Sequence, residues 1–323
     1  MNPSELFLVP VQEDIHAIEE LILSQADGYQ QDLKAALEHL LSSGGKRMRP
    51  TLTLFSGRML GAEKRRLLTM AAAIELLHTA TLVHDDLIDS SLLRRGIPTL
   101  NAQWTPGATV LTGDFLFARA AKLAADTDSI PVMHLFSATL SAIVNGEIAQ
   151  MFNSRCQIDR SEYYTRIYAK TASLFETSAA SAALLSPVEK PVVEQMGKFG
   201  YNIGMAFQIV DDILDFTGEQ ATLGKPVGGD LRQGLITLPT ILYAENHPDD
   251  PMVEMFTRGN CNQNDGQVER LIEAIQMSEA PHQAMAEARQ FIQNGVKYLT
   301  GLPESFERSQ LLHLAEYIVD RKL

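Results

Sequence analysis

The sequence predicts an all-α protein that forms a single domain over residues 1–323. Three observations support this prediction. Apolar residues recur with helical spacing through most of the chain, whereas the alternating apolar and polar runs typical of strands are hard to find. No repeat of 20–50 residues is visible, which argues against a solenoid. A chain of 323 residues, 45% of them hydrophobic, can bury a large core without disulfides.

The helices can be followed in order along the chain. The first is indicated by apolar residues at i, i+3, i+4, i+7 and i+8, namely Leu33, Ala36, Leu37, Leu40 and Leu41. We expect it to end at residues 42–45, which contain two glycines, with Pro50 beyond. Further helical patterns cover residues 64–89, 107–125, 131–152, 161–185, 192–216, 239–244, 266–277, 280–299 and 304–321. The stretch 171–185 is small or apolar nearly all round, which predicts a central helix of a large bundle.

Three segments between these patterns are polar or rich in Gly and Pro, and they predict loops over residues 42–50, 90–106 and 219–238. Residues 227–230 lack the flanking apolar runs that a hairpin would need. Functional residues often lie on loops that a rigid scaffold holds in place.

Charge and composition exclude several classes of protein. The 27 basic and 40 acidic residues give a net charge of −13, which argues against nucleic acid or an anionic membrane surface as the main partner. No Lys or Arg precedes Lys34, and no run of 18 apolar residues occurs, so we expect neither a secretory signal nor a transmembrane segment. The two cysteines, Cys156 and Cys261, match no metal-binding spacing. We therefore expect a cytoplasmic protein.

The strongest signal is the pattern DDxxD, which occurs twice and late in an apolar helical pattern each time. The first motif comprises Asp85, Asp86 and Asp89, and the second comprises Asp211, Asp212 and Asp215. Composition alone would produce about 0.06 such matches in the whole chain. Most charge runs are solvated helix faces, but these motifs have apolar flanks, which a fully solvated helix would not have.

The spacing of the motifs points to divalent cations. Carboxylates four residues apart share one helix face and repel one another, so a cation should compensate them. Mg²⁺ binds through one or two carboxylates, keeps several waters and shares phosphate oxygens of a substrate. Two acidic helix faces therefore predict Mg²⁺ ions around one phosphorylated substrate, where the ions would stabilise a leaving diphosphate.

Basic residues near these motifs suit a second phosphorylated group, because the Arg fork matches phosphate oxygens. The candidates are Lys46, Arg49, Arg94, Arg95, Lys170 with the adjoining Thr171, and Lys225. Each alone is better explained as a surface residue. His78, seven residues before Asp85, and Gln208, three before Asp211, leave two alternatives open, which are a hydrogen-bonded core residue and a substrate contact.

The ordered motifs resemble those of a known family. They read GGKRMRP, HTATLVHDDLIDSSLLRRG, GDFLFARA, GEIAQ, KTASLFE, FQIVDDILDF, LGKPVGGDL and TLP, and they extend over most of the chain. The sequence is similar to the trans-prenyltransferases, also called E-isoprenyl diphosphate synthases. Within that family it most resembles the bacterial long-chain synthases that make quinone side chains, such as octaprenyl or solanesyl diphosphate synthase.

The resemblance implies an all-α isoprenoid-synthase helical bundle with a central active-site cavity, usually as a homodimer. It implies Mg²⁺, three ions per site with substrate bound, at Asp85, Asp89 and Asp211, with Asp86, Asp212 and Asp215 in support. It implies isopentenyl diphosphate at Lys46, Arg49, His78 and Arg95, and an allylic diphosphate at Arg94, Lys170, Thr171, Gln208 and Lys225. Catalytic roles are implied for Asp85, Asp89, Asp211, Lys170 and Lys225.

The reaction implied is ionisation of the allylic C–O bond, attack by the isopentenyl double bond on the carbocation, and loss of a proton. Positioning and electrostatics would supply the catalysis without a protein nucleophile. One departure from the family pattern is Leu235, at a position that often holds Lys, which places one diphosphate contact in doubt.

Product length follows from the residues before the first motif. Ala80 and Thr81, five and four residues before Asp85, are small, whereas bulky aromatics there close the pocket in short-chain members of the family. No insertion separates Asp86 from Asp89 beyond Leu87 and Ile88. We therefore expect a product longer than C20, with a deeper floor on the helix that contains Phe115.

Four alternatives remain. A geranylgeranyl or farnesyl diphosphate synthase differs only in product length. A terpene cyclase usually carries a different second metal motif. A non-catalytic subunit of a heteromeric synthase tends to lose one Asp motif, and this chain keeps both. A purely structural helical protein predicts no Mg²⁺-dependent diphosphate binding.

Overall fold

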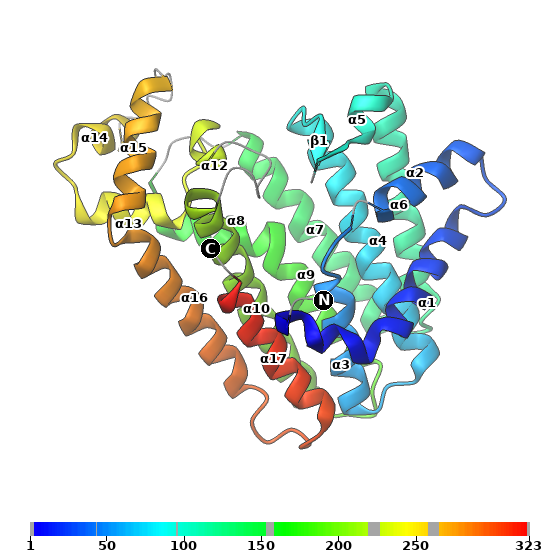
Figure 1. Cartoon of the computed structure of the whole chain (residues 1–323). Helices are drawn as coiled ribbons and strands as arrows, with labels where there is room; N and C mark the ends of the chain where they lie inside the picture. Colours follow the sequence, from blue (N-terminus) through cyan, green and yellow to red (C-terminus); the bar gives the residue numbers. More distant parts are fainter. Residues whose placement is uncertain are drawn as a thin grey trace. The chain divides into compact units, whose positions relative to one another are not determined.

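The computed structural model describes residues 3–42, 44–94, 96–152, 158–218, 227–257 and 265–321. Helices dominate this part of the chain (Figure 1), which confirms the all-α prediction. The first half contains η1 (Pro3–Val11), α1 (Gln12–Leu23), η2 (Ser24–Ala26), α2 (Gln31–Ser42), α3 (Met48–Leu60), α4 (Lys64–Ile88), β1 (Leu93–Arg94), β2 (Ile97–Pro98), α5 (Leu100–Gln103), α6 (Pro106–Ala125) and α7 (Ile130–Phe152). The second half contains α8 (Arg160–Ile167), η3 (Tyr168–Ala172), α9 (Ser173–Leu184), α10 (Lys190–Thr217), α12 (Gly229–Arg232), α13 (Leu238–Asn246), α14 (Pro251–Thr257), α15 (Asp265–Met277), α16 (Ala280–Lys297) and α17 (Phe306–Asp320).

The predicted loops contain more structure than expected. Helix α3 begins at Met48, inside the predicted loop 42–50, and Pro50 lies in its first turn, where proline is tolerated. Helix α3 is buried on nearly every side, so its sequence has no amphipathic period by which to find it. The predicted loop 90–106 contains α5 and a hairpin that pairs Leu93 with Pro98 and Arg94 with Ile97. These two-residue strands are too short to alternate visibly.

Two further differences concern the second half. The helical pattern 161–185 is three segments, because one turn of π-helix, η3, separates α8 from α9. Residues 227–230 do not form a loop throughout, since α12 begins at Gly229. Gly228 has φ of +69°, and a side chain there would meet Ile272, so this turn requires glycine.

The chain forms two compact units, each assembled from separate stretches. The first unit contains residues 1–139, 174–200 and 299–314, and the second contains residues 140–173, 201–298 and 315–323. The first acidic motif belongs to the first unit and the second motif to the second unit. The single-domain interpretation of residues 1–323 stays a prediction.

Helix α4 forms the core of the first unit and runs antiparallel to α6. Arg66 near the start of α4 donates to the carbonyl of Thr127 at 2.7 Å, and His84 near its end bonds the carbonyl of Val110 at 3.1 Å. A side chain at Gly113 would meet the His84 ring, so the two helices are in close contact there. This packing fixes the end of α4, which carries the first motif.

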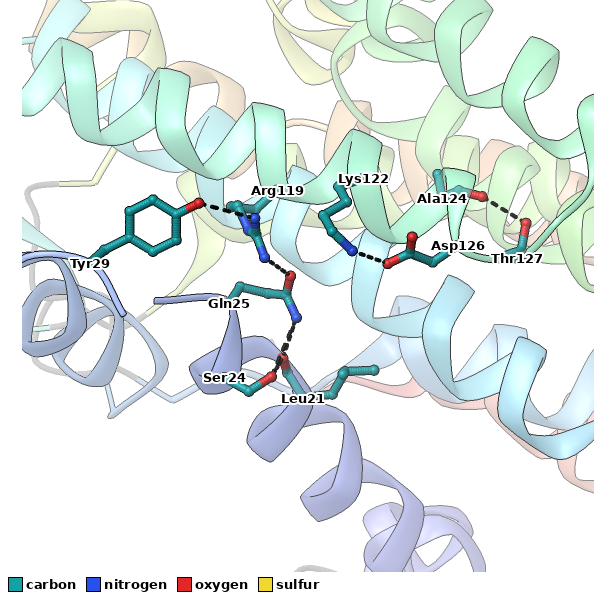
Figure 2. Close-up of polar contacts among 9 residues, drawn as sticks. All are labelled: Leu21, Ser24, Gln25, Tyr29, Arg119, Lys122, Ala124, Asp126 and Thr127. Carbon is teal, nitrogen blue, oxygen red and sulfur yellow. Dashed lines mark hydrogen bonds and ion pairs between the residues drawn. The ribbon is translucent and has the colours of Figure 1, made fainter. Parts of the chain in front are cut away.

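Figure 2 shows how the N-terminal helices attach to α6. Arg119 donates to Gln25 Oε1 at 2.8 Å and to the Tyr29 hydroxyl at 3.4 Å, and the Tyr29 ring meets Phe115 edge-on at 5.0 Å. Thr127 donates to the carbonyl of Ala124 at 2.7 Å beyond the end of α6. The contacts of Gln25 and Tyr29 thus attach η2 and the turn after it to α6.

Length and composition would allow two helices, α4 and α7, to cross a bilayer. Of the apolar stretch of α4, 72% is buried inside the protein, which fits a core helix, whereas only 22% of the corresponding stretch of α7 is buried. The apolar side chains that α7 exposes include Ile130, Val144, Ile148 and Phe152. The absence of a transmembrane segment stays a prediction.

Candidate functional site

The first acidic motif lies at the C-terminal end of α4, and its three carboxylates have different surroundings. Asp85 is half-buried, Asp86 is buried, and Asp89 is the exposed residue that caps the helix, with its backbone N–H bonded to the carbonyl of Asp85 at 2.8 Å. Arg94 of β1 donates through Nε and Nη2 to both oxygens of Asp86 at 2.8–3.0 Å. This two-pronged ion pair compensates the buried charge of Asp86. Asp85 and Asp89 lie one turn apart and are accessible to solvent.

The second motif lies near the end of α10, where its middle carboxylate is also buried. Asp212 accepts from the Tyr163 hydroxyl at 2.7 Å and from the Gln208 amide at 2.8 Å. Burial raises the pKa of Asp212 to about 8, and the nearby Asp230 carboxylate adds to the rise, while the bonds from Gln208 and Tyr163 oppose it. Burial and the carboxylate of Asp212 raise the pKa of Tyr163 well above its usual value, so the phenol is the donor.

The outer carboxylates of the second motif have other partners. Asp215 accepts from the backbone N–H groups of Gly229 and Asp230, both at 3.2 Å, where α12 begins. Asp211 pairs with Arg321 at 2.8 Å, and its side chain is 38% exposed. Asp211 and Asp215 are thus partly accessible to solvent, whereas Asp212 between them is buried.

The π-helical turn η3 places Lys170 and Thr171 beside α10. Thr171 donates to Gln208 Oε1 at 2.6 Å, so a continuous chain of hydrogen bonds joins η3 to Asp212. Lys170 pairs with Glu147 of α7 at 3.2 Å. A side chain at Gly146 would meet Ala169, which means that η3 and α7 approach closely there. Single turns of π-helix are frequent at functional sites.

Two further predicted basic residues of the first unit, Lys46 and Arg49, lie just before and within the first turn of α3. Lys46 is exposed, and the guanidinium of Arg49 lies 4.7 Å from the centre of the Phe175 ring. The residue between them, Arg47, donates to Glu19 at 2.9 Å and to the buried Glu75 at 2.8 Å, which makes it part of the packing. His78, Ala80 and Thr81 lie on α4, one to two turns before Asp85, and Ala80 is fully buried.

The predicted site residues with described positions are divided between the two units. The first unit contains Asp85, Asp86, Asp89 and Arg94, with His78 on α4, Arg49 on α3 and Lys46 just before α3. The second unit contains Lys170, Thr171, Gln208, Asp211, Asp212 and Asp215. Leu235 also belongs to the second unit and is half-buried. Arg95 and Lys225 lie outside the described residues.

Comparison with known proteins identifies the family. A family model described as polyprenyl synthetase matches residues 30–275. This chain belongs to the polyprenyl synthetase family. Among its curated relatives, the heptaprenyl diphosphate synthase component 2 of Geobacillus stearothermophilus is 36% identical over 96% of this chain and 97% of that protein. The all-trans-nonaprenyl-diphosphate synthase (geranyl-diphosphate specific) of Rhodobacter capsulatus is 37% identical and covers 97% of each chain.

A solved structure agrees with this assignment. The polyprenyl synthase from Caulobacter crescentus, complexed with calcium and isoprenyl diphosphate, matches with a TM-score of 0.91 and 33% identity over 98% of this chain and 97% of that one. The predicted isoprenoid-synthase fold and the predicted family are thus confirmed. The chain is a prenyltransferase of the polyprenyl diphosphate synthase class, with long-chain relatives.

Several residues of this polyprenyl synthetase that contact the predicted site residues were not predicted. Tyr163 lies in no recognisable motif, and Arg321 lies at the end of the last helical pattern, 110 residues from Asp211. Glu147 lies within GEIAQ, but its spacing gives no reason to pair it with Lys170. No sequence signal identified the first two, whereas the GEIAQ motif pointed to the neighbourhood of the third.

The donor set of this polyprenyl synthetase suits an oxygen-preferring cation. No cluster of three or more His, Cys, Asp or Glu side chains that could hold a metal occurs among the residues with described positions. The two motifs offer carboxylate oxygens, and a metal held by one or two of them would take its other ligands from water or phosphate. That is how Mg²⁺ usually binds at phosphate-transfer sites.

Proposed function

We propose that this chain condenses isopentenyl diphosphate with an allylic diphosphate, in the presence of Mg²⁺, to make an all-trans polyprenyl diphosphate longer than C20 for quinone side chains. The observation that carries the proposal is the pair of DDxxD motifs, each with a buried middle carboxylate held by protein groups and with more accessible carboxylates beside it. This pattern leaves Asp85, Asp89 and Asp211 as the metal-binding groups, with Asp86, Asp212 and Asp215 in support.

The remaining residues would hold the two substrates. Three Mg²⁺ ions, when bound with substrate, would stabilise the negative charge of the departing diphosphate. Lys170, Thr171, Gln208, Lys225 and Arg94 would bind the allylic diphosphate, and Lys46, Arg49, His78 and Arg95 the isopentenyl diphosphate. Arg94 already contacts Asp86, but a guanidinium has five N–H donors and can serve a phosphate as well. The protein would contribute binding, orientation and charge.

The proposed product length is based on the two residues of α4 that lie four and five positions before Asp85. Ala80 is fully buried, and the next residue, Thr81, turns its hydroxyl to the carbonyl of His78 at 2.7 Å. Neither side chain is a bulky aromatic that could stop a growing product at this turn of α4. The relatives named for heptaprenyl and nonaprenyl products support a tail of similar length.

We propose that the active form is a homodimer that uses the exposed apolar faces of α6 and α7. Leu111 is 69% exposed, Ile130 73% and Phe152 83%, and large apolar side chains exposed in this way are available to a protein interface. A second candidate is a heteromeric synthase, and the relative named component 2 favours it. Light scattering of the purified chain, alone and mixed with a candidate partner subunit, separates the two.

The test is one incubation of purified protein with Mg²⁺, farnesyl diphosphate and labelled isopentenyl diphosphate, with products resolved by length. A ladder that ends beyond C20 is expected. A stop at C20 would keep the chemistry but refute the proposed length. No Mg²⁺-dependent product with any allylic primer would contradict the catalytic proposal and favour the partner-subunit alternative, with Leu235 as the first residue to replace by Lys.

A further inference from the structure

Arg321, just beyond the end of α17, contacts the second acidic motif at the first of its carboxylates. Its Nη1 donates to Asp211 Oδ1 at 2.8 Å, and its Nη2 donates to the carbonyl of Phe207 at 3.3 Å. Its Nε donates to the carbonyl of Ile318 at 3.3 Å, and the guanidinium lies 4.1 Å from the centre of the Phe207 ring. The side chain is only 8% exposed, so the charge is held by contacts on several sides.

The geometry of this contact spans one helical turn of α10. Phe207 and Asp211 are four residues apart and lie on the same face, and Arg321 bonds both while stacking on the aromatic ring. A planar guanidinium suits this arrangement, whereas a Lys ammonium could not make the same set of donations. All three residues belong to the second unit.

We propose that Arg321 is a positioning residue that orients the Asp211 carboxylate for its metal ion. A carboxylate has about four lone-pair sites, so a bond from Arg321 to Oδ1 leaves acceptor capacity for a cation. Groups that hydrogen-bond a metal ligand fix its orientation, and their loss typically costs about 10- to 100-fold in metal affinity. The inference rests on the proposed function, because it requires Asp211 to bind metal.

The direction of the effect separates positioning from simple charge. A buried positive charge beside Asp211 repels a divalent cation, so if charge alone mattered, removing Arg321 would tighten metal binding. If Arg321 holds the carboxylate in place, removing it weakens metal binding. If Arg321 only anchors the end of α17, metal binding stays as it was.

The experiment is a titration of Mn²⁺ into metal-free full-length protein, followed by the paramagnetic resonance signal of free Mn²⁺. The variants are Arg321→Met, Arg321→Lys, Asp211→Asn and the double variant Arg321→Met with Asp211→Asn. Arg289→Met, on the exposed face of α16, is the matched control for the lost charge. Melting temperatures of all variants show whether they fold. If Arg321→Met does not fold, Arg321→Lys is used for the titration instead.

Arg321→Met is expected to weaken Mn²⁺ binding about 10- to 100-fold, Arg321→Lys less, and the control not at all. In the Asp211→Asn background, Arg321→Met should have no further effect, because the two residues act as one unit. Tighter binding, unchanged binding or an additive effect would overturn the inference while the wild type still binds Mn²⁺ and makes product. A wild type that binds no Mn²⁺ and makes no product would overturn the proposed function itself.

Discussion

Asp86 and Asp212 occupy the same place in their motifs, and both are buried, but different groups hold them. Asp86 faces a charged partner, Arg94, which contacts both of its oxygens. Asp212 faces two neutral donors, Tyr163 and Gln208, and burial raises its pKa to about 8. The second motif has its ion pair on its first carboxylate instead, where Arg321 pairs with Asp211.

The same sequence motif is therefore stabilised by different contacts at its two positions in the chain. In the first motif the positive charge of Arg94 compensates the middle residue, Asp86, and α4 ends at the exposed Asp89. In the second motif the middle residue is held by hydrogen bonds, and Asp215 receives the first N–H groups of α12. Both motifs therefore have their first carboxylate as a proposed metal ligand, but different groups hold their middle carboxylates in place.

Removal of metal should have the largest effect, and it should affect both motifs together. Treatment with excess EDTA, followed by dialysis, is expected to reduce incorporation of labelled isopentenyl diphosphate by at least about 100-fold, because the developing charge of the diphosphate loses its main stabiliser. Added Mg²⁺ should restore the rate. Undiminished incorporation without metal would remove the functional reason for pairing the two motifs.

The next largest effect concerns the residues four and five positions before each motif. These are Ala80 and Thr81 in α4, but Ala206 and Phe207 in α10, where the Phe207 ring packs against Arg321. Only the first pair is small enough to leave a path for a growing chain, so Ala80→Tyr should shorten the product. Ala286→Tyr, on the exposed face of α16, is the control. Product analysis that finds the same length in Ala80→Tyr and wild type would contradict this difference between the helices.

The smallest expected effects distinguish the partners of the middle carboxylates. Arg94→Gln should lower the free energy of unfolding by about 2 kcal/mol, because it removes a charge-assisted pair from a buried carboxylate. Tyr163→Phe should lower it by about 1 kcal/mol, because it removes one donor from a carboxyl group whose pKa is already raised. Urea denaturation of metal-free protein measures both, with Arg289→Gln as a control for the charge. A larger loss of unfolding free energy from Tyr163→Phe than from Arg94→Gln would contradict the stated difference between the two middle carboxylates.

The sequence predicted the helices that carry the motifs because their apolar positions are periodic. The pattern over 64–89 corresponds to α4, and the pattern over 192–216 corresponds to α10. The i, i+4 spacing also placed Asp85 and Asp89 on successive turns. Where a helix is buried all round, as α3 is, no such period exists and the prediction failed.

Contacts between distant parts of the chain were beyond the reach of sequence patterns. Tyr163 and Arg321 lie 49 and 110 residues from their carboxylate partners, and no local spacing relates them. The π-helical turn that carries Lys170 was predicted as ordinary helix, because the stretch that follows is small or apolar nearly all round and so has no period that an extra residue could shift. Such features depend on tertiary packing and not on local preference.

The central claim is that Asp85, Asp89 and Asp211 bind metal, whereas the buried middle carboxylates mainly stabilise the protein. Asn is placed singly at Asp85, Asp86, Asp211 and Asp212, and each variant is measured for half-saturating Mg²⁺ in prenyl transfer and for melting temperature. The account predicts that Asp85→Asn and Asp211→Asn raise the Mg²⁺ requirement by about 10-fold or more with little change in melting temperature. Asp86→Asn and Asp212→Asn should mainly lower the melting temperature. The opposite division, with metal affinity lost at the middle positions and stability lost at the outer ones, would contradict it.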